Sequence, residues 1–173
     1  TFVRFLYADD ILTTDVMAKV KMPKLDKPIL PAFSQADIGK IIAACECERD
    51  KAICLFMLDT GVRASELCAL KVGDFDIATG ATMVKRGKGG KGRTVYCGSK
   101  SRRAVLRYLL SRNNPAESEP LFPSLRDGKS LKPNGLLLMF RRIGARSGVQ
   151  EVHPHTFRRS FALMSLRAGM DLI

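Results

Sequence analysis

A glycine-rich segment at residues 87–92 constrains the fold of this chain more than any other feature of its sequence. Stretches of alternating, β-branched character flank it at residues 81–86 and 93–97. Because glycine lets a chain turn sharply, the two stretches are predicted to be the strands of one antiparallel hairpin. The segment also matches the dinucleotide-binding pattern G-x-G-x-x-G, but that pattern requires a helix after it, and here a strand-like stretch follows. We therefore reject a dinucleotide site and predict a basic hairpin tip.

Helical periodicity dominates the rest of the sequence. Ser34 and Asp37 form a capping-box-like start to the first long helix, and Gly169 is a stop signal after the last one. Ser99 is predicted to cap the helix that follows the hairpin. The predicted fold class is α+β, mainly α-helical with a small antiparallel β-hairpin. The expected helices are residues 34–45, 49–59, a short one from about 63 to 70, 99–112, 133 or 134 to 146, and 155–168.

Two units are expected along the chain. Residues 1–31 are interpreted as the end of one unit and a linker, since three prolines interrupt residues 21–31. Residues 32–173 have the length and apolar content of a single domain. The first residue is Thr rather than Met, so we expect an excised piece of a longer protein. The opening residues also carry a Tyr-x-Asp-Asp string at Tyr7–Asp10, which we interpret as the end of an amphipathic helix rather than a metal site.

The charge indicates a polyanionic partner. The 173 residues include 29 Lys plus Arg and 17 Asp plus Glu, a formal net charge of +12. Residues 1–50 hold 7 basic and 8 acidic side chains, whereas residues 51–173 hold 22 and 9, so the later part carries the whole excess. The basic clusters are Lys85–Arg93, Arg102–Arg112 and Arg141–Arg146. Solvated helix faces would also explain such clusters, but this density favours nucleic acid.

Composition excludes several classes. No apolar run approaches the roughly 20 residues of a membrane helix, and the first stretch lacks the pattern of a secretory signal. The five cysteines contain no C-x-x-C pair, and there are only two histidines, so no metal site is expected. The thiols are interpreted as small apolar core residues in a reducing cytoplasm.

Two short segments carry the polar residues most suited to chemistry. In Thr60–Leu67, Arg63 and Glu66 stand three residues apart, and in His155–Ala162 His155 and Arg158 have the same spacing. That spacing places each pair on one helical face. Both pairs lie near an expected helix start, where anions are favoured. Two arginines, a histidine and a lysine from the hairpin tip would together surround one phosphate.

These residues resemble the tyrosine recombinase, or phage integrase, family. The family's first catalytic Arg lies in a segment matched by Gly61-Val-Arg63-Ala-Ser-Glu66-Leu67. Its catalytic Lys lies on a β-hairpin matched by Gly87-Lys88-Gly-Gly-Lys91-Gly-Arg93, and its second Arg lies in a segment matched by His155-Thr-Phe-Arg158-Arg159. The resemblance implies the recombinase catalytic fold for residues 32–173. It implies that residues 1–31 are the remnant of an N-terminal core-binding domain and its linker.

The resemblance also implies an activity, the cleavage and rejoining of DNA strands through a 3′-phosphotyrosyl intermediate without metal or cofactor. Arg63 and Arg158 would hold the scissile phosphate, Lys88 would be the general acid and His155 would assist proton transfer. Glu66 would orient Arg63, and Arg159 would support the site although the family often has His there. Expected DNA contacts are Lys85, Arg86, Lys91, Arg93, Arg141 and Arg142. The partner would be double-stranded DNA bound by a homotetramer, in the cytoplasm of a bacterial or phage-type system and associated with the nucleoid.

The nucleophilic tyrosine is not expected in this chain. The family's nucleophile follows the second Arg segment, whereas Tyr7, Tyr96 and Tyr108 all precede it. We therefore expect residues 32–173 to be a C-terminally incomplete catalytic domain that is inactive alone. A non-catalytic DNA-binding module of the same fold and a type IB topoisomerase-like enzyme remain open. An RNA-associated basic domain would explain the charge but not the three ordered motifs.

Overall fold

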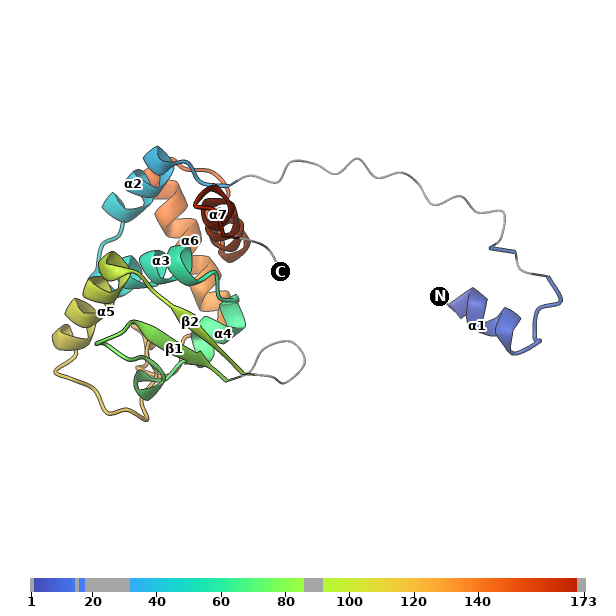
Figure 1. Cartoon of the computed structure of the whole chain (residues 1–173), viewed down its shortest axis with the longest axis horizontal. Coiled ribbons are helices and arrows are strands. Elements are labelled where there is room, and N and C mark those ends of the chain that lie inside the picture. Colours follow the sequence, from blue (N-terminus) through green and yellow to red (C-terminus); the bar gives the residue numbers. More distant parts are fainter. Residues whose placement is uncertain (1, 15, 18–31, 86–91, 171–173) are drawn as a thin grey trace.

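The computed structural model describes residues 2–14, 16–17, 32–85 and 92–170. Most of the described chain is helical, and its two strands form one antiparallel sheet, as the sequence predicts (Figure 1). The linker expected before residue 32 falls largely at residues 18–31, which lie outside the described residues. The elements are α1 (Phe2–Ala8), α2 (Gln35–Ala43), α3 (Glu48–Thr60), α4 (Ala64–Ala69), the 3-10 helix η1 (Val72–Asp74), β1 (Ala81–Val84), β2 (Arg93–Tyr96), α5 (Ser99–Ser111), α6 (Pro133–Ser147) and α7 (Pro154–Arg167).

Local sequence signals set several helix ends. At the start of α2 the Ser34 hydroxyl accepts a hydrogen bond from the Asp37 amide at 3.1 Å, and the Asp37 carboxylate accepts one from the Ser34 amide at 3.1 Å. This confirms the predicted capping box. Gly148 ends α6 with a φ of 67°, and Gly169 follows α7 with a φ of 83°. Glycine adopts this left-handed backbone without the Cβ strain that other residues incur.

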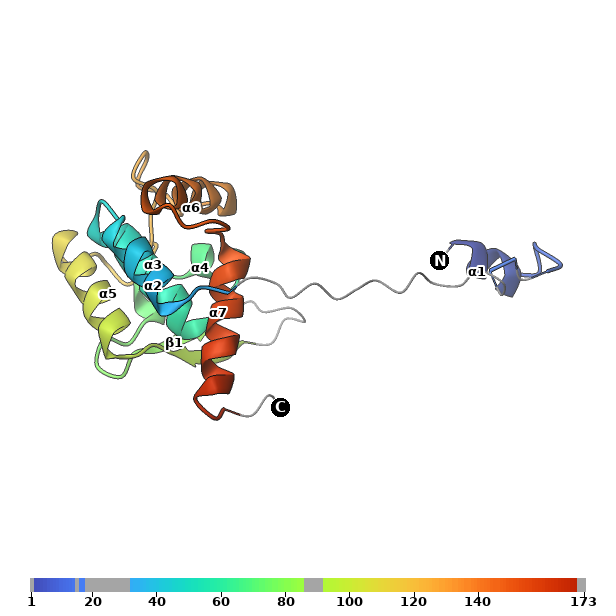
Figure 2. The same cartoon turned by 90° about the horizontal axis from the view of Figure 1, so that it is seen from above.

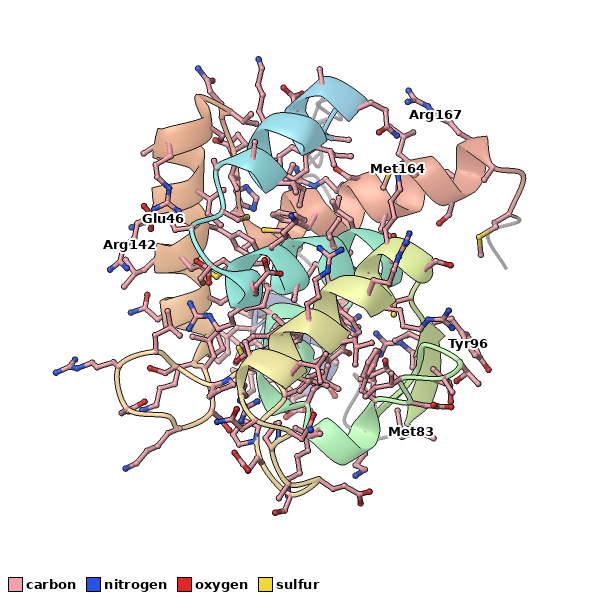
Figure 3. The ribbon with its side chains drawn as sticks, turned by 90° about the vertical axis from the view of Figure 1, so that its left-hand side faces the viewer. Glu46, Met83, Tyr96, Arg142, Met164 and Arg167 are labelled. Atoms are coloured by element: carbon pink, nitrogen blue, oxygen red, sulfur yellow. The ribbon has the colours of Figure 1, made fainter. Side chains whose placement is uncertain are left out.

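The hairpin joins β1 and β2 with Ala81 opposite Tyr96 and Val84 opposite Arg93. The first strand ends at Val84, two residues earlier than predicted, and the second ends at Tyr96 rather than residue 97. One face of the hairpin is packed, since Thr82 and Val84 are buried. Met83 and Tyr96 occupy the exposed face (Figure 3).

Helix α3 is the centre of the domain. Its predicted apolar face is confirmed, because Ile53, Phe56 and Met57 are all fully buried. Phe56 also makes edge contacts with the rings of Phe75 and Phe122. Helices α5 and α7 both pack against α3. The C-terminal end of α3 is buried, since its last residue, Thr60, is buried. Figure 2 shows α7 running crosswise to α6 at one edge of the helical body.

The cap of α5 differs from the sequence prediction. Gly98, not Ser99, is the N-cap residue, and Ser99 is the first helical residue. The acceptor comes from α3, where the Asp59 carboxylate receives the Gly98 amide at 2.7 Å and the Ser101 hydroxyl at 2.6 Å. A carboxylate at a helix N-terminus also interacts favourably with the helix dipole. A long-range contact therefore replaces the local serine cap.

Among the described residues, no helix combines the length and apolar character required to cross a membrane.

Candidate functional site

The break between α3 and α4 presents Arg63. Gly61 ends α3 with a φ of 56°, and a Cβ at this position would lie 2.3 Å from Cδ1 of Phe161. Glycine is therefore required here both by the backbone and by the ring packed against it. The chain then passes through buried Val62 to Arg63, which is the N-cap residue of α4. The Arg63 side chain remains 44% exposed, so its guanidinium is accessible from outside.

Glu66 holds Arg63 in place. One carboxylate oxygen accepts the Arg63 amide at 2.8 Å, and the other accepts Nη1 of Arg63 at 3.0 Å. The same carboxylate also receives both Nη atoms of Arg93 on β2, at 2.9 and 2.7 Å. The Glu66 side chain is only 2% exposed. Its hydrogen bonds, those from Arg93 foremost, lower the pKa of Glu66 to about 2, so the buried carboxylate is charged at neutral pH.

The N-terminal turns of α7 bring the second predicted segment to the same place. Pro154 is the first helical residue, His155 beside it is exposed and Arg158 is half-buried. Nη1 of Arg158 donates a hydrogen bond to the carbonyl oxygen of Gly61, 97 residues away in the sequence. Partial burial and the neighbouring charge of Arg63 both lower the pKa of Arg158. The charges of the two arginines thus repel each other, and an anion bound between them would relieve that repulsion.

A cavity of about 560 Å³ lies between the starts of α4, α6 and α7. Its walls combine apolar residues with three of the predicted site residues and a second histidine. The lining residues are Val62, Arg63, Ala64, Ser65, Pro133, Leu137, His153, Pro154, His155 and Arg158. Two guanidinium groups and the N-terminus of a 14-residue helix in one cavity favour a phosphate or another oxyanion. No acidic residue lines the cavity, and within the described parts of the chain no group of three His, Cys, Asp or Glu is placed to hold a metal ion.

The other predicted site residues that the structure describes do not line this cavity. Arg159 is half-buried on α7, and Arg141 is exposed on α6. Arg142 is also exposed on α6, as Figure 3 shows. Lys85 forms an ion pair with Asp74, and Arg93 is bonded to Glu66. Lys88, Arg86 and Lys91 lie outside the described residues.

His153 is a cavity residue that sequence reasoning did not select. It is the N-cap residue of α7, and its Nε2 lies 2.9 Å from a carboxylate oxygen of Glu151. A sequence signal was available, because the proline at position 154 is favoured at the first position of a helix and leaves His153 at the cap. His153 and His155 then flank that proline, with ring centroids 6.2 Å apart.

None of the three tyrosines of the chain lines the cavity. Tyr108 is buried and stacked on Phe122, with ring centroids 6.0 Å apart, and burial raises the pKa of its phenol. Tyr96 is on the exposed face of the hairpin and Tyr7 belongs to α1. The cavity therefore holds anion-binding groups without a tyrosine of its own.

Two curated relatives show how much of a longer protein this chain matches. It is 32% identical to tyrosine recombinase XerA of Pyrococcus horikoshii over 156 residues, which are 89% of this chain and 54% of that protein. It is 32% identical to tyrosine recombinase XerC of Actinobacillus pleuropneumoniae over 174 residues, 97% of this chain and 56% of that protein. The chain thus spans about half the length of the curated relatives it matches.

Solved structures share the fold. The crystal structure of XerA recombinase superposes with a TM-score of 0.76 at 30% identity, covering 96% of this chain and 59% of that one. The Tn1549 transposon integrase in complex with circular intermediate DNA gives a TM-score of 0.76 at 19% identity, covering 97% and 63%. The second similarity concerns the fold alone. The family model described as the phage integrase family matches residues 32–173, and this chain therefore belongs to the phage integrase family of tyrosine recombinases.

Proposed function

We propose that residues 32–173 belong to the catalytic domain of a site-specific recombinase that cleaves and rejoins double-stranded DNA. Residues 1–31 would then be the end of a core-binding domain and its linker. One observation carries the proposal: Arg63 lines the same cavity as His155 and Arg158, which are more than 90 residues further along the sequence. A lone basic surface would not bring these three residues together in one cavity.

In the proposed reaction the cavity holds the scissile phosphate. The guanidinium groups of Arg63 and Arg158 bind its non-bridging oxygens, where negative charge increases in the transition state. A tyrosine phenolate oxygen forms a bond to phosphorus while the bond from phosphorus to the 5′ oxygen breaks. Lys88 gives its proton to that leaving 5′ oxygen. Rejoining is the reverse reaction, in which a 5′-hydroxyl attacks the phosphotyrosyl bond.

The remaining site residues support these steps. His155, exposed at the start of α7, assists proton transfer and contacts the phosphate. Glu66 orients Arg63 through the two hydrogen bonds described above. Arg159 contributes positive charge behind Arg158. Arg141 and Arg142, which are exposed on α6, and Arg86 and Lys91 bind phosphates of the flanking duplex.

The nucleophile in this proposal is a tyrosine outside these 173 residues. The absence of Tyr7, Tyr96 and Tyr108 from the cavity lining supports this assignment. The whole protein would act on DNA in the cytoplasm as a homotetramer.

The proposal is tested with the full-length protein that contains this chain and a nicked DNA substrate that traps the covalent intermediate. Arg63→Ala and Arg158→Ala are each expected to lower the rate of adduct formation by about 100-fold or more, because each removes a transition-state donor. Arg126→Ala, at an exposed arginine in the loop before α6, is the matched control and should leave the rate unchanged. The measurement is the protein–DNA adduct on a denaturing gel, and wild-type rates in either site variant would contradict the assignment.

The same substrate tests where the nucleophile lies when it is mixed with the 173-residue chain alone. This chain is expected to bind DNA and to form no adduct. An adduct would place the nucleophile among Tyr7, Tyr96 and Tyr108 and contradict the proposal that it lies outside these residues.

If the full-length wild-type protein binds DNA without cleaving it, the alternative of a non-catalytic DNA-binding module of this fold is supported. Relaxation of supercoiled DNA without site preference would support the topoisomerase-like alternative.

A further inference from the structure

Two basic residues at the base of the hairpin are both bound to buried carboxylates. Val84 and Arg93 form the last described pair of the β-ladder, and Lys85 follows directly after that pair. Lys85 is ion-paired with Asp74 at the end of η1, whose side chain is 5% exposed. Arg93 is ion-paired with Glu66 of α4, whose side chain is 2% exposed. Both described ends of the hairpin are therefore fixed to the neighbouring helices by charged contacts.

The contact between Arg93 and Glu66 is bidentate. Nη1 and Nη2 of Arg93 donate to the two different carboxylate oxygens at 2.9 and 2.7 Å. This is the strongest geometry available to an arginine–carboxylate pair. Because its two Nη atoms point at Glu66, Arg93 does not present that face of its guanidinium to DNA. The sequence-based expectation that Arg93 contacts DNA is therefore not favoured by its placement.

Glu66 connects this contact to the cavity. Besides both Nη atoms of Arg93, its carboxylate accepts the backbone amide and Nη1 of Arg63. Arg63 uses only one of its side-chain nitrogens in the contacts described, which leaves Nε and Nη2 for another ligand. A buried carboxylate without Arg93 would have only Arg63 to neutralise it. Arg63 would then turn further toward Glu66 and away from the cavity, since an unpaired buried charge is costly.

We propose that Arg93 is a positioning residue for Arg63 and acts through Glu66 rather than on DNA. By satisfying the carboxylate, Arg93 leaves Arg63 facing the cavity with free donors. The ion pair between Lys85 and Asp74 acts separately and anchors the end of β1. The effect on catalysis rests on the proposed function, whereas the coupling of Arg93 to Glu66 and Arg63 does not.

The first experiment tests the coupling in this chain and requires no DNA cleavage. The carboxyl group of Glu66 is titrated by carbon-13 NMR in the wild type, Arg93→Gln, Arg93→Lys and the control Lys85→Gln. Arg93→Gln is expected to raise the pKa of Glu66 from about 2 toward its ordinary value. Arg93→Lys should raise it less, and Lys85→Gln, which removes a charge from the same hairpin, should leave it unchanged. The proposal would be overturned if the pKa of Glu66 were unchanged in Arg93→Gln, or if it rose equally in Lys85→Gln.

The second experiment separates positioning from DNA contact. DNA affinity of this chain is measured against salt concentration for Arg63→Gln and for the double variant Arg63→Gln with Arg93→Gln. Without Arg63, loss of a positioning residue leaves the salt dependence unchanged, whereas loss of a direct Arg93–phosphate contact would reduce the slope by about 0.9. That reduction would overturn the proposal. If Arg93→Gln fails to fold, as judged by thermal unfolding, Arg93→Lys replaces it in the titration of Glu66 and the uncharged variant Arg93→Met replaces it in the salt series.

The third experiment measures the consequence in the full-length protein. Arg93→Gln is expected to lower the adduct-forming rate at saturating DNA by about 10- to 100-fold, with the half-saturating DNA concentration unchanged. Arg93→Lys should recover part of that loss. A rise in the half-saturating concentration alone would contradict the positioning role. If the wild type forms no adduct, the proposed function fails, and the titration of Glu66 still tests the coupling independently.

Discussion

At the scale of single residues, Glu66 links the stability of the domain to its cavity. Its pKa is lowered from 4.5 to about 2 in the folded chain, so the folded state favours the charged carboxylate. A lowered carboxyl pKa contributes stability that is fully present above the unfolded pKa and is lost as pH falls toward the folded one. The pH window for this group is therefore about 4.5 down to 2.

We predict that Glu66→Gln destabilises the chain by about 2–3 kcal/mol at pH 7, because the lowered pKa represents stabilisation of that order and the two arginines lose their acceptor. The same variant should lose less stability than the wild type between pH 4.5 and pH 2. Urea unfolding at several pH values measures both effects. A variant as stable as the wild type at pH 7 would show that the carboxylate contributes nothing.

Gly61 is the second residue whose identity the structure explains. Its φ of 56° already disfavours a side chain, and Phe161 occupies the space that a Cβ would need. We predict that Gly61→Ala costs about 2–4 kcal/mol, since it combines left-handed backbone strain with overpacking. Gly148→Ala is the matched control, because Gly148 has a φ of 67° with nothing near its Cβ position. That control should cost only about 1–2 kcal/mol in urea unfolding, and equal losses would exclude a contribution from Phe161.

At the scale of elements, the start of α5 depends on α3. The Asp59 carboxylate receives the amide of Gly98 and the hydroxyl of Ser101, whereas Ser99 makes no side-chain cap. We predict that Asp59→Ala destabilises the chain by about 0.5–2 kcal/mol, the range measured for lost helix caps. Ser99→Ala should change stability by less than about 0.5 kcal/mol. Thermal unfolding of both variants tests this. A larger loss of stability in Ser99→Ala than in Asp59→Ala would support the serine cap predicted from the sequence.

At the scale of the whole molecule, the net charge of +12 predicts salt-dependent DNA binding. The affinity of this chain should fall steeply as salt rises, because bound Lys and Arg displace counterions from phosphates. Arg141→Gln combined with Arg142→Gln is expected to reduce the slope by up to about 1.8 if both contact phosphates. Arg112→Gln is the control, since its guanidinium is bonded to Glu119 and to the carbonyl oxygens of Pro120 and Leu121. An equal change of slope in the control would show that only net charge matters.

The sequence by itself determined the type and order of the main helices and strands and three of the residues that line the cavity. The capping box at Ser34, the hairpin around the glycine-rich segment and the apolar face of α3 are local patterns, so they follow from neighbouring residues. The sequence predicts Arg63, His155 and Arg158 as site residues, because Arg63 with Glu66 and His155 with Arg158 have helical spacing near a helix start. The structure brings all three to one cavity.

Only the tertiary structure decided which charged groups face each other. In the sequence Arg93 and Lys85 belong to a basic run, and nothing local distinguishes them from residues that contact DNA. Folding places Glu66 and Asp74 beside them, 27 and 11 residues away in the chain. Asp59 likewise reaches the start of α5 from 39 residues away, and His153 at the start of α7 lines the cavity together with residues of α4 and α6. The physical reason is that ion pairs and caps between distant segments depend on packing, which residue spacing alone does not encode.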